Sequence, residues 1–90
     1  MRLELTARAN QDLKRVYDFN LQRGDTWADK VQKRLLDRAQ ALTSRPNPGQ
    51  PLGKTGVIRL SVVDVQYVID YELAGDAVRI LRVQHTREIE

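Results

Sequence analysis

The side chains of this sequence that can take part in chemistry gather in its C-terminal half. His85 is the only histidine among the 90 residues, and histidine is the side-chain type that exchanges a proton near neutral pH. Cationic side chains that could hold an anionic group accompany it in this half, namely Lys54, Arg59, Arg79, Arg82 and Arg87. Acidic residues lie among them, namely Asp64, Asp70, Glu72 and Asp76. These residue types would suit proton transfer beside a bound anion. The acidic residues, however, leave the charge of this region almost balanced.

The rest of the composition excludes several kinds of site. The chain has no cysteine, which rules out disulfides and thiolate metal ligands. A metal bound through His85 would need carboxylates as all its other protein ligands, so we expect no metal and no other cofactor. No nucleophile-elbow motif supports a Ser-His-Asp triad.

The charge is unevenly distributed along the chain. Residues 1–45 carry ten basic and six acidic side chains, whereas residues 46–90 carry five and six, within a net charge of +3. The basic half would suit an acidic protein or a nucleic acid as a partner. Apolar runs are no longer than two or three residues and the N-terminus lacks a secretion signal, so we expect a cytoplasmic protein without a membrane span.

Two amphipathic helices are predicted in the basic half. Apolar residues recur at three- and four-residue spacing from Ala7 to about Gln22, with Asn20 as a polar residue within the apolar stripe. Thr6 can cap the first turn of this helix. The segment Arg23-Gly24-Asp25 interrupts the pattern, and a second helix is expected from about Trp27 to Thr43. So short a break predicts an antiparallel helical hairpin, with Trp27 packing within it.

Strands are predicted on both sides of the hairpin in the sequence. Arg2–Leu5 alternates between polar and apolar residues, as a short first strand would. Ser44–Gly56 contains three prolines and three glycines and predicts an exposed loop. The apolar period then falls to two and predicts strands over Val57–Val63, Val65–Leu73 and Ala77–His85, the last two joined by a turn at Gly75.

The order of these elements predicts the architecture. We expect one domain over residues 1–90 of the α+β class, in the order β-α-α-β-β-β, with the hairpin on one face of a small antiparallel-rich sheet. Arg2–Leu5 should pair with one of the last three strands to bury its leucines. Ala77–His85 is apolar on both faces, as in an interior strand, and simple alternation places Arg79 and Arg82 on opposite faces. The face away from the helices is left for solvent or a partner.

Four stretches of this chain, in register with the predicted elements, resemble a known family. They are A-N-Q-D-L-K-R-V-Y over Ala9–Tyr17, I-R-L over Ile58–Leu60, Y-V-I-D-Y over Tyr67–Tyr71, and I-L-R-V-Q-H-T-R over Ile80–Arg87. The chain resembles the RelE/ParE superfamily of bacterial toxins from type II toxin–antitoxin modules over essentially its whole length. The resemblance implies a growth-arresting toxin, a cognate antitoxin as partner and a toxin–antitoxin hetero-oligomer.

The superfamily leaves two targets open, because a shared scaffold does not fix a function. RelE-like members cut mRNA on the ribosome, whereas ParE-like members poison DNA gyrase. For the nuclease alternative, the working groups would be Arg59, Arg82, His85 and Arg87. This set is incomplete, because the family's nucleases tend to place a tyrosine near the chain end, and Tyr67 and Tyr71 have the parity of core residues. Asp70 or Glu72 can also pair with Arg59 across the strands.

We therefore favour a ParE-like toxin that contacts gyrase and does no chemistry of its own. The alternatives are the ribosome-dependent mRNA endonuclease and a non-toxic interaction module on the same scaffold. Under the favoured hypothesis His85 is a strand-end residue hydrogen-bonded to backbone. The predicted partner-binding residues are Arg34, Arg38, Arg59 and Arg82. The antitoxin is expected to cover the open sheet face and the cleft beside the hairpin with acidic and apolar residues.

Overall fold

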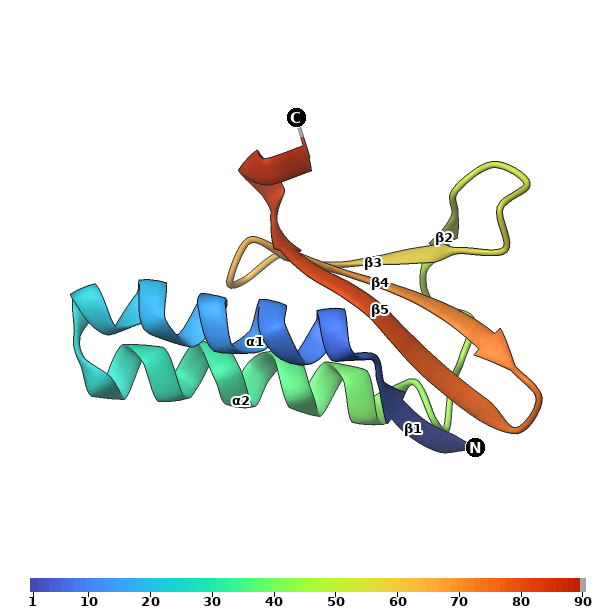
Figure 1. Ribbon diagram of the computed structural model, residues 1–90, viewed down its shortest axis with the longest axis horizontal. Helices are drawn as coiled ribbons and strands as arrows, with labels where there is room; N and C mark the ends of the chain where they lie inside the picture. Colours follow the sequence, from blue (N-terminus) through green and yellow to red (C-terminus); the bar gives the residue numbers. More distant parts are fainter. Residues whose placement is uncertain (90) are drawn as a thin grey trace.

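A computed structural model of the chain describes residues 1–89. Two helices form a hairpin that lies against one face of a sheet, as predicted (Figure 1). The elements in chain order are β1 (Arg2–Leu5), α1 (Ala7–Asn20), the 3₁₀ turn η1 (Leu21–Arg23), α2 (Asp25–Ala41), β2 (Gln50–Pro51), β3 (Ile58–Val62), β4 (Tyr67–Ala74), β5 (Ala77–His85) and the 3₁₀ turn η2 (Thr86–Ile89).

The sheet has the strand order β1-β5-β4-β3-β2. The predicted pairing of the first strand is confirmed, because β1 lies parallel to β5, with Leu3 opposite Val78. The remaining neighbours are antiparallel. The predicted loop contains one strand that sequence patterning did not predict, the two-residue β2 at the sheet edge. The α+β fold class is confirmed.

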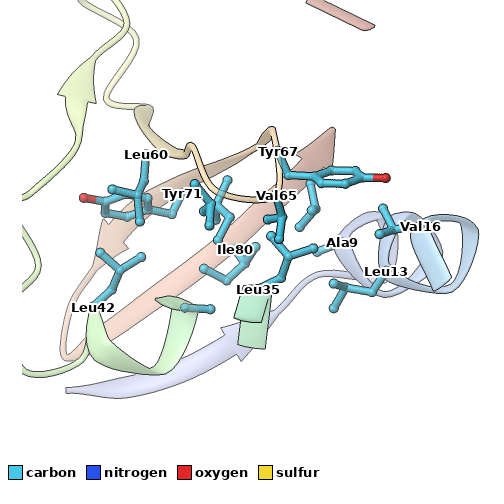
Figure 2. Close-up of a cluster of buried hydrophobic side chains, with 14 of the residues drawn as sticks. Ala9, Leu13, Val16, Leu35, Leu42, Leu60, Val65, Tyr67, Tyr71 and Ile80 are labelled. Carbon is cyan, nitrogen blue, oxygen red and sulfur yellow. The ribbon is translucent and has the colours of Figure 1, made fainter. Parts of the chain in front are cut away.

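The core fills the space between the hairpin and the sheet (Figure 2). Val16 and Leu35 from the two helices meet Ile69 and Ile80 from the two central strands. Burying such side chains contributes about 1.5–3 kcal/mol each, which makes the hairpin and the sheet stable only together. Tyr67 and Tyr71 are both buried, as their parity predicted.

The hairpin begins and turns through local chemistry. The Thr6 hydroxyl accepts a hydrogen bond from the Ala9 amide at 3.0 Å and caps α1, as predicted. The first helix gives way to η1 after Asn20, and Gly24, at φ +105°, lets α2 begin immediately. The two helices therefore run antiparallel, and their turn extends beyond the edge of the sheet (Figure 1).

β5 is an interior strand of the sheet, as predicted, but a β-bulge corrects what alternation predicted about its two faces. Asp70 faces Arg82 and the next residue, Tyr71, faces Ile80, so Leu81 is an extra residue on β5. Strict alternation fails at this point, and Val83 joins Ile80 on the helix side. The apolar residues on both parities of β5 therefore reflect the bulge. For the same reason Arg79 and Arg82 lie on one face, and the prediction of opposite faces was wrong.

No helix among residues 1–89 has the length and apolarity needed to cross a membrane.

Candidate functional site

The open face of the sheet carries three of the arginines that the sequence singles out. Arg59, Arg79 and Arg82 face Asp70 or Glu72 across the strand pairs, which places all three on the side away from the helices. Arg59 binds Asp70 through two bonds, Nε to Oδ1 at 2.7 Å and Nη2 to Oδ2 at 2.8 Å. The predicted pairing of Arg59 with an acid on the neighbouring strand is confirmed.

The other two arginines are also paired. Arg79 Nε lies 3.2 Å from Glu4 Oε2 on β1, and its Nη1 lies 3.4 Å from Glu72 Oε1 on β4. Arg82 Nε lies 2.8 Å from Asp12 Oδ2 on helix α1. A phosphate or an external carboxylate would have to displace these partners to reach the three guanidinium groups.

Asp12 is a buried carboxylate that joins α1 to the edge of β5. Its side chain is 3% exposed and accepts hydrogen bonds from Arg82 Nε, from the Val83 amide at 2.9 Å and from Arg15 Nη2 at 3.3 Å. Burial by itself would raise the pKa of this carboxyl, but the hydrogen bonds to the charged form outweigh it and the pKa is lowered. Asp12 therefore acts as a charged tether between helix and sheet.

His85 lies on the opposite face of the sheet from these arginines. It faces Tyr67 across β4 and β5, and the two rings meet edge to face at a centroid distance of 5.1 Å. The His85 Nδ1 accepts a hydrogen bond from the Arg87 amide at 3.1 Å. A neutral imidazole in this arrangement carries its proton on Nε2.

The structure therefore does not bring the four candidate nuclease residues together. Arg59 and Arg82 lie on the open face, whereas His85 faces the helix side and Arg87 follows it in η2. Lys54 forms no ion pair within residues 1–89. The predicted bond between His85 and the backbone is present, and the functional role of each of these residues stays a prediction.

A groove runs past His85 on the helix side. One part, about 580 Å³, lies between α1 and η2, and a second part of about 210 Å³ continues toward Trp27, with Phe19, Gln66, Tyr67 and His85 lining both. The side chain of Phe19 projects into solvent, and the residue is 60% exposed. An exposed aromatic residue beside a groove is typical of a protein-binding surface.

Asn20 fixes the shape of this groove. Its side-chain amide donates to the Val16 carbonyl at 2.7 Å and to the Tyr67 hydroxyl at 3.0 Å, and its carbonyl accepts from Trp27 Nε1 at 2.9 Å. Burial raises the pKa of Tyr67, and the bond to Asn20 opposes that rise. The polar residue in the apolar stripe is thus a hub that joins α1, α2 and β4.

The charges of the groove are only partly neutralised. Glu88 is paired with Arg15 at 2.8 Å, and Asp64 is paired with Arg34 at 2.6 Å. Arg23 lies over the Trp27 ring at 4.1 Å, and neither Arg23 nor Arg87 has an acidic partner in the part of the chain that the structure describes. The acidic side chains of the groove are thus held in ion pairs, while Arg23 and Arg87 are available to an acidic partner.

Within residues 1–89, no group of three or more histidine, cysteine or acidic side chains is placed to bind a metal ion.

Comparison with known proteins decides the family. The family model for the ParE toxin of the type II toxin–antitoxin system parDE matches residues 3–90. The chain belongs to the ParE toxin family. A comparison with curated protein sequences gives no match.

Solved structures share the fold of this ParE-family chain. A chain of the chromosomal ParDE system from P. aeruginosa is 24% identical with a TM-score of 0.84, over 94% of this chain and 95% of that one. A RelBE toxin–antitoxin complex from Mycobacterium tuberculosis matches at 21% identity and a TM-score of 0.72, over 93% and 95%. The E. coli RelBE complex matches at 15% and 0.69, over 93% and 94%.

The predicted partner-binding arginines of this ParE-family chain differ in whether an acidic residue of the chain already holds them. Arg34 is held by Asp64, Arg59 by Asp70 and Arg82 by Asp12. Arg38 is half-buried and has no acidic partner within residues 1–89. Sequence reasoning missed Asp12, because its partners Arg82 and Val83 are 70 and 71 residues away along the chain. It also missed Phe19 and Arg23, because no local pattern shows that they lie beside a groove. Only Asn20, a polar residue in an apolar stripe, carried a signal that could have been followed.

Proposed function

We propose that this ParE-family chain arrests bacterial growth by poisoning DNA gyrase through protein contacts, and that it does not cut RNA. Cleavage of an RNA phosphodiester needs a base for the 2′-hydroxyl, cations for the transferring phosphate and an acid for the leaving oxygen. The observation that carries the proposal is the separation of these groups. Arg59 and Arg82 lie on the open face, whereas His85 and Arg87 line the groove on the helix side.

The charge of the open face supports the same conclusion. Arg59, Arg79 and Arg82 are each bonded to a carboxylate, so binding RNA there would expose acids to phosphates. The hydrogen bond from the Arg87 amide to His85 Nδ1 also leaves Nε2 as a donor, which does not suit it to accept the 2′-hydroxyl proton. Arg34, Arg38, Arg59 and Arg82 remain our predicted partner-contact residues.

Inducible expression in bacteria tests the proposal. Wild-type chain should stop colony growth with induction of the SOS response and gyrase-dependent DNA breaks, and ribosome profiling should find no new mRNA cuts. His85→Ala should leave growth arrest nearly intact. If His85 were a catalytic base or acid, its loss would lower the rate about a hundredfold or more. Codon-positioned mRNA cleavage that disappears in His85→Ala would contradict the proposal, and normal growth under wild-type expression would favour a non-toxic module.

The partner that neutralises this toxin is proposed to be a cognate antitoxin docked in the groove beside Phe19. The similar ParDE and RelBE structures come from toxin–antitoxin systems. The groove combines exposed apolar surface with Arg23 and Arg87, which have no acidic partner within residues 1–89. An antitoxin segment with an apolar residue flanked by carboxylates would satisfy both features.

Truncating Phe19 tests this docking site. Phe19→Ser should weaken binding of the co-encoded antitoxin by about tenfold or more, because a central exposed aromatic is a typical source of binding energy. Isothermal titration of the purified pair gives the affinity. Leu73→Ser is the matched control, since Leu73 is also an exposed apolar residue but lies at the β4–β5 turn. Equal losses in the two variants, or none, would place the antitoxin elsewhere.

A further inference from the structure

One edge of the sheet is closed by side chains. β1 covers only the first residues of β5, up to Ile80. Beyond that point, the Val83 amide donates to Asp12, and the Val83 carbonyl accepts from Arg15 Nη2 at 3.4 Å. The Leu81 carbonyl accepts from the Thr6 hydroxyl at 3.3 Å. Backbone groups that could have paired with another chain are therefore already bonded.

The outer edge of β3, in contrast, is covered only in part. β2 covers only two of its residues, with Gln50 opposite Arg59 and Pro51 opposite Ile58. The Leu52 amide donates to the Val57 carbonyl, so Val57 faces the β2 side, and by alternation the amide and carbonyl of Ser61 do too. Within residues 1–89 no strand lies opposite Ser61 on this side.

A preformed cleft lies along this open edge. It measures about 450 Å³ and is lined by the end of α2, by β2 with the loop before it, and by β3 from Arg59 to Ser61. Its loop wall is fixed, since the buried Tyr71 donates through its hydroxyl to the Pro46 carbonyl at 2.7 Å. Gly49 packs so tightly that a Cβ there would lie 2.7 Å from Ile58 Cγ2. A partner chain would therefore meet a rigid site.

The cleft is cationic. Residues 38–63 contain no aspartate or glutamate. Arg59 is satisfied by Asp70 from β4, but Arg38 lines the cleft, half-buried, without an acidic partner in the described part of the chain. Arg45 and Lys54 of the adjoining loop likewise form no ion pair within residues 1–89. The positive charge at this edge therefore has no counterpart within those residues.

We propose that an extended, acidic protein segment binds here by adding as a strand beside Ser61, with one of its carboxylates held by Arg38. Strand addition supplies main-chain hydrogen bonds, and an Arg–carboxylate contact supplies charge-assisted ones. An unpaired strand edge inside a narrow cleft suits a peptide backbone, whereas a nucleic acid would use the cations alone. The proposal does not depend on gyrase being the target of the toxin.

Two synthetic hexapeptides with blocked ends test the proposal, one alternating valine with glutamate and the other valine with lysine. Nuclear magnetic resonance of the full chain should show that the acidic peptide shifts the Ser61 amide signal and slows its hydrogen exchange. The basic peptide should do neither. Arg38→Gln should weaken the acidic peptide about tenfold, as expected for the loss of a charged hydrogen-bonding partner. Lys14→Gln, which removes an exposed charge on α1, should leave the affinity unchanged.

The backbone part of the proposal has its own pair of variants. Ser61→Pro removes the outward amide but spares the ladder to β4, so it should fold and lose the peptide. Ser61→Ala keeps the amide and should bind normally. Equal binding of both peptides, unchanged exchange at Ser61, or an oligonucleotide that competes fully for the site would overturn the proposal. Should Ser61→Pro fail to fold, the contrast between Arg38→Gln and Lys14→Gln still decides.

Discussion

Asp12 contributes more to the stability of the fold than an aspartate on a helix usually does. A carboxylate on a helix is usually solvated, but this one is buried and accepts hydrogen bonds from side chains and from the backbone of β5. Removing its charge would leave the Arg82 guanidinium and the Val83 amide with poorer partners. The resulting loss in the free energy of unfolding is larger than the contribution of an exposed ion pair.

Asp12→Asn should therefore destabilise the fold by about 1–3 kcal/mol at pH 7, measured as the free energy of unfolding in urea. The pKa of Asp12 is lowered in the folded state, whereas an unfolded aspartate ionises near pH 3.9. The stabilisation by the Asp12 carboxylate is thus complete well above pH 4, and it is lost as the pH falls through the lowered pKa of the folded state. The difference between wild type and variant should shrink toward pH 3. Asp37→Asn, at an exposed pair with Lys33, should change stability little at either pH.

At the residue scale, sequence predicts contacts between neighbours on adjacent strands but not contacts between layers. Strand alternation predicted that Arg59 pairs with Asp70 or Glu72 on the neighbouring strand, and the register of β3 and β4 selects Asp70. Asp12 and Arg82 are separated by 70 residues and belong to different layers, so no local pattern marks them. Such contacts depend on how the hairpin is placed on the sheet.

At the scale of elements, periodicity predicted both helices and the three long strands, and it failed where a strand is irregular. Each helix and long strand is continuous enough for its apolar residues to show a period. The bulge at Leu81 inserts one residue into β5 and moves every later side chain to the other face. Nothing in the composition of Ile80–Val83 distinguishes a bulge from a strand buried on both faces. The face on which Arg82 lies therefore had to come from the structure.

The junction of α1, α2 and β4 depends on Asn20. Asn20→Ala would leave the Trp27 indole nitrogen and the Tyr67 hydroxyl without their partner in a half-buried region. We expect a loss of about 2–3 kcal/mol in the free energy of unfolding, together with a change in Trp27 fluorescence. Asn10→Ala, on the exposed side of the same helix, is the control and should change neither. Unchanged fluorescence in Asn20→Ala would show that Trp27 is held by packing alone.

At the scale of the whole molecule, the distribution of paired and free charges separates the faces. The open sheet face has its arginines bonded to acids. Arg23 and Arg87 in the helix-side groove and Arg38 in the β3-edge cleft have no acidic partner within residues 1–89. Sequence counting correctly found the C-terminal half close to neutral, but it could not say which cations were neutralised. That depends on the register of the strands, which pairs Arg59 with Asp70 and Arg79 with Glu4 and Glu72, and on the placement of α1, which brings Asp12 to Arg82.

If this pairing is what keeps RNA from the sheet, then removing acids should create an RNA-binding face. Glu4→Gln combined with Glu72→Gln frees Arg79, whose two carboxylate partners these are. Affinity for single-stranded RNA should rise several-fold, and the dependence of log K on log salt should steepen by about 0.7 for a gained phosphate contact. Fluorescence anisotropy over a salt series measures both.

The matched control is Asp18→Asn combined with Asp25→Asn, which raises the net charge equally but removes acids that form no ion pair within residues 1–89. If position decides, only the sheet-face pair should steepen the salt dependence, because only there does an existing arginine lose its partner. Equal steepening in both doubles would mean that RNA responds to net charge alone. A wild-type chain that already binds RNA with a steep salt dependence, abolished by Arg79→Gln, would show that the paired face admits phosphates. The ion pairs of the sheet face would then not exclude RNA cleavage.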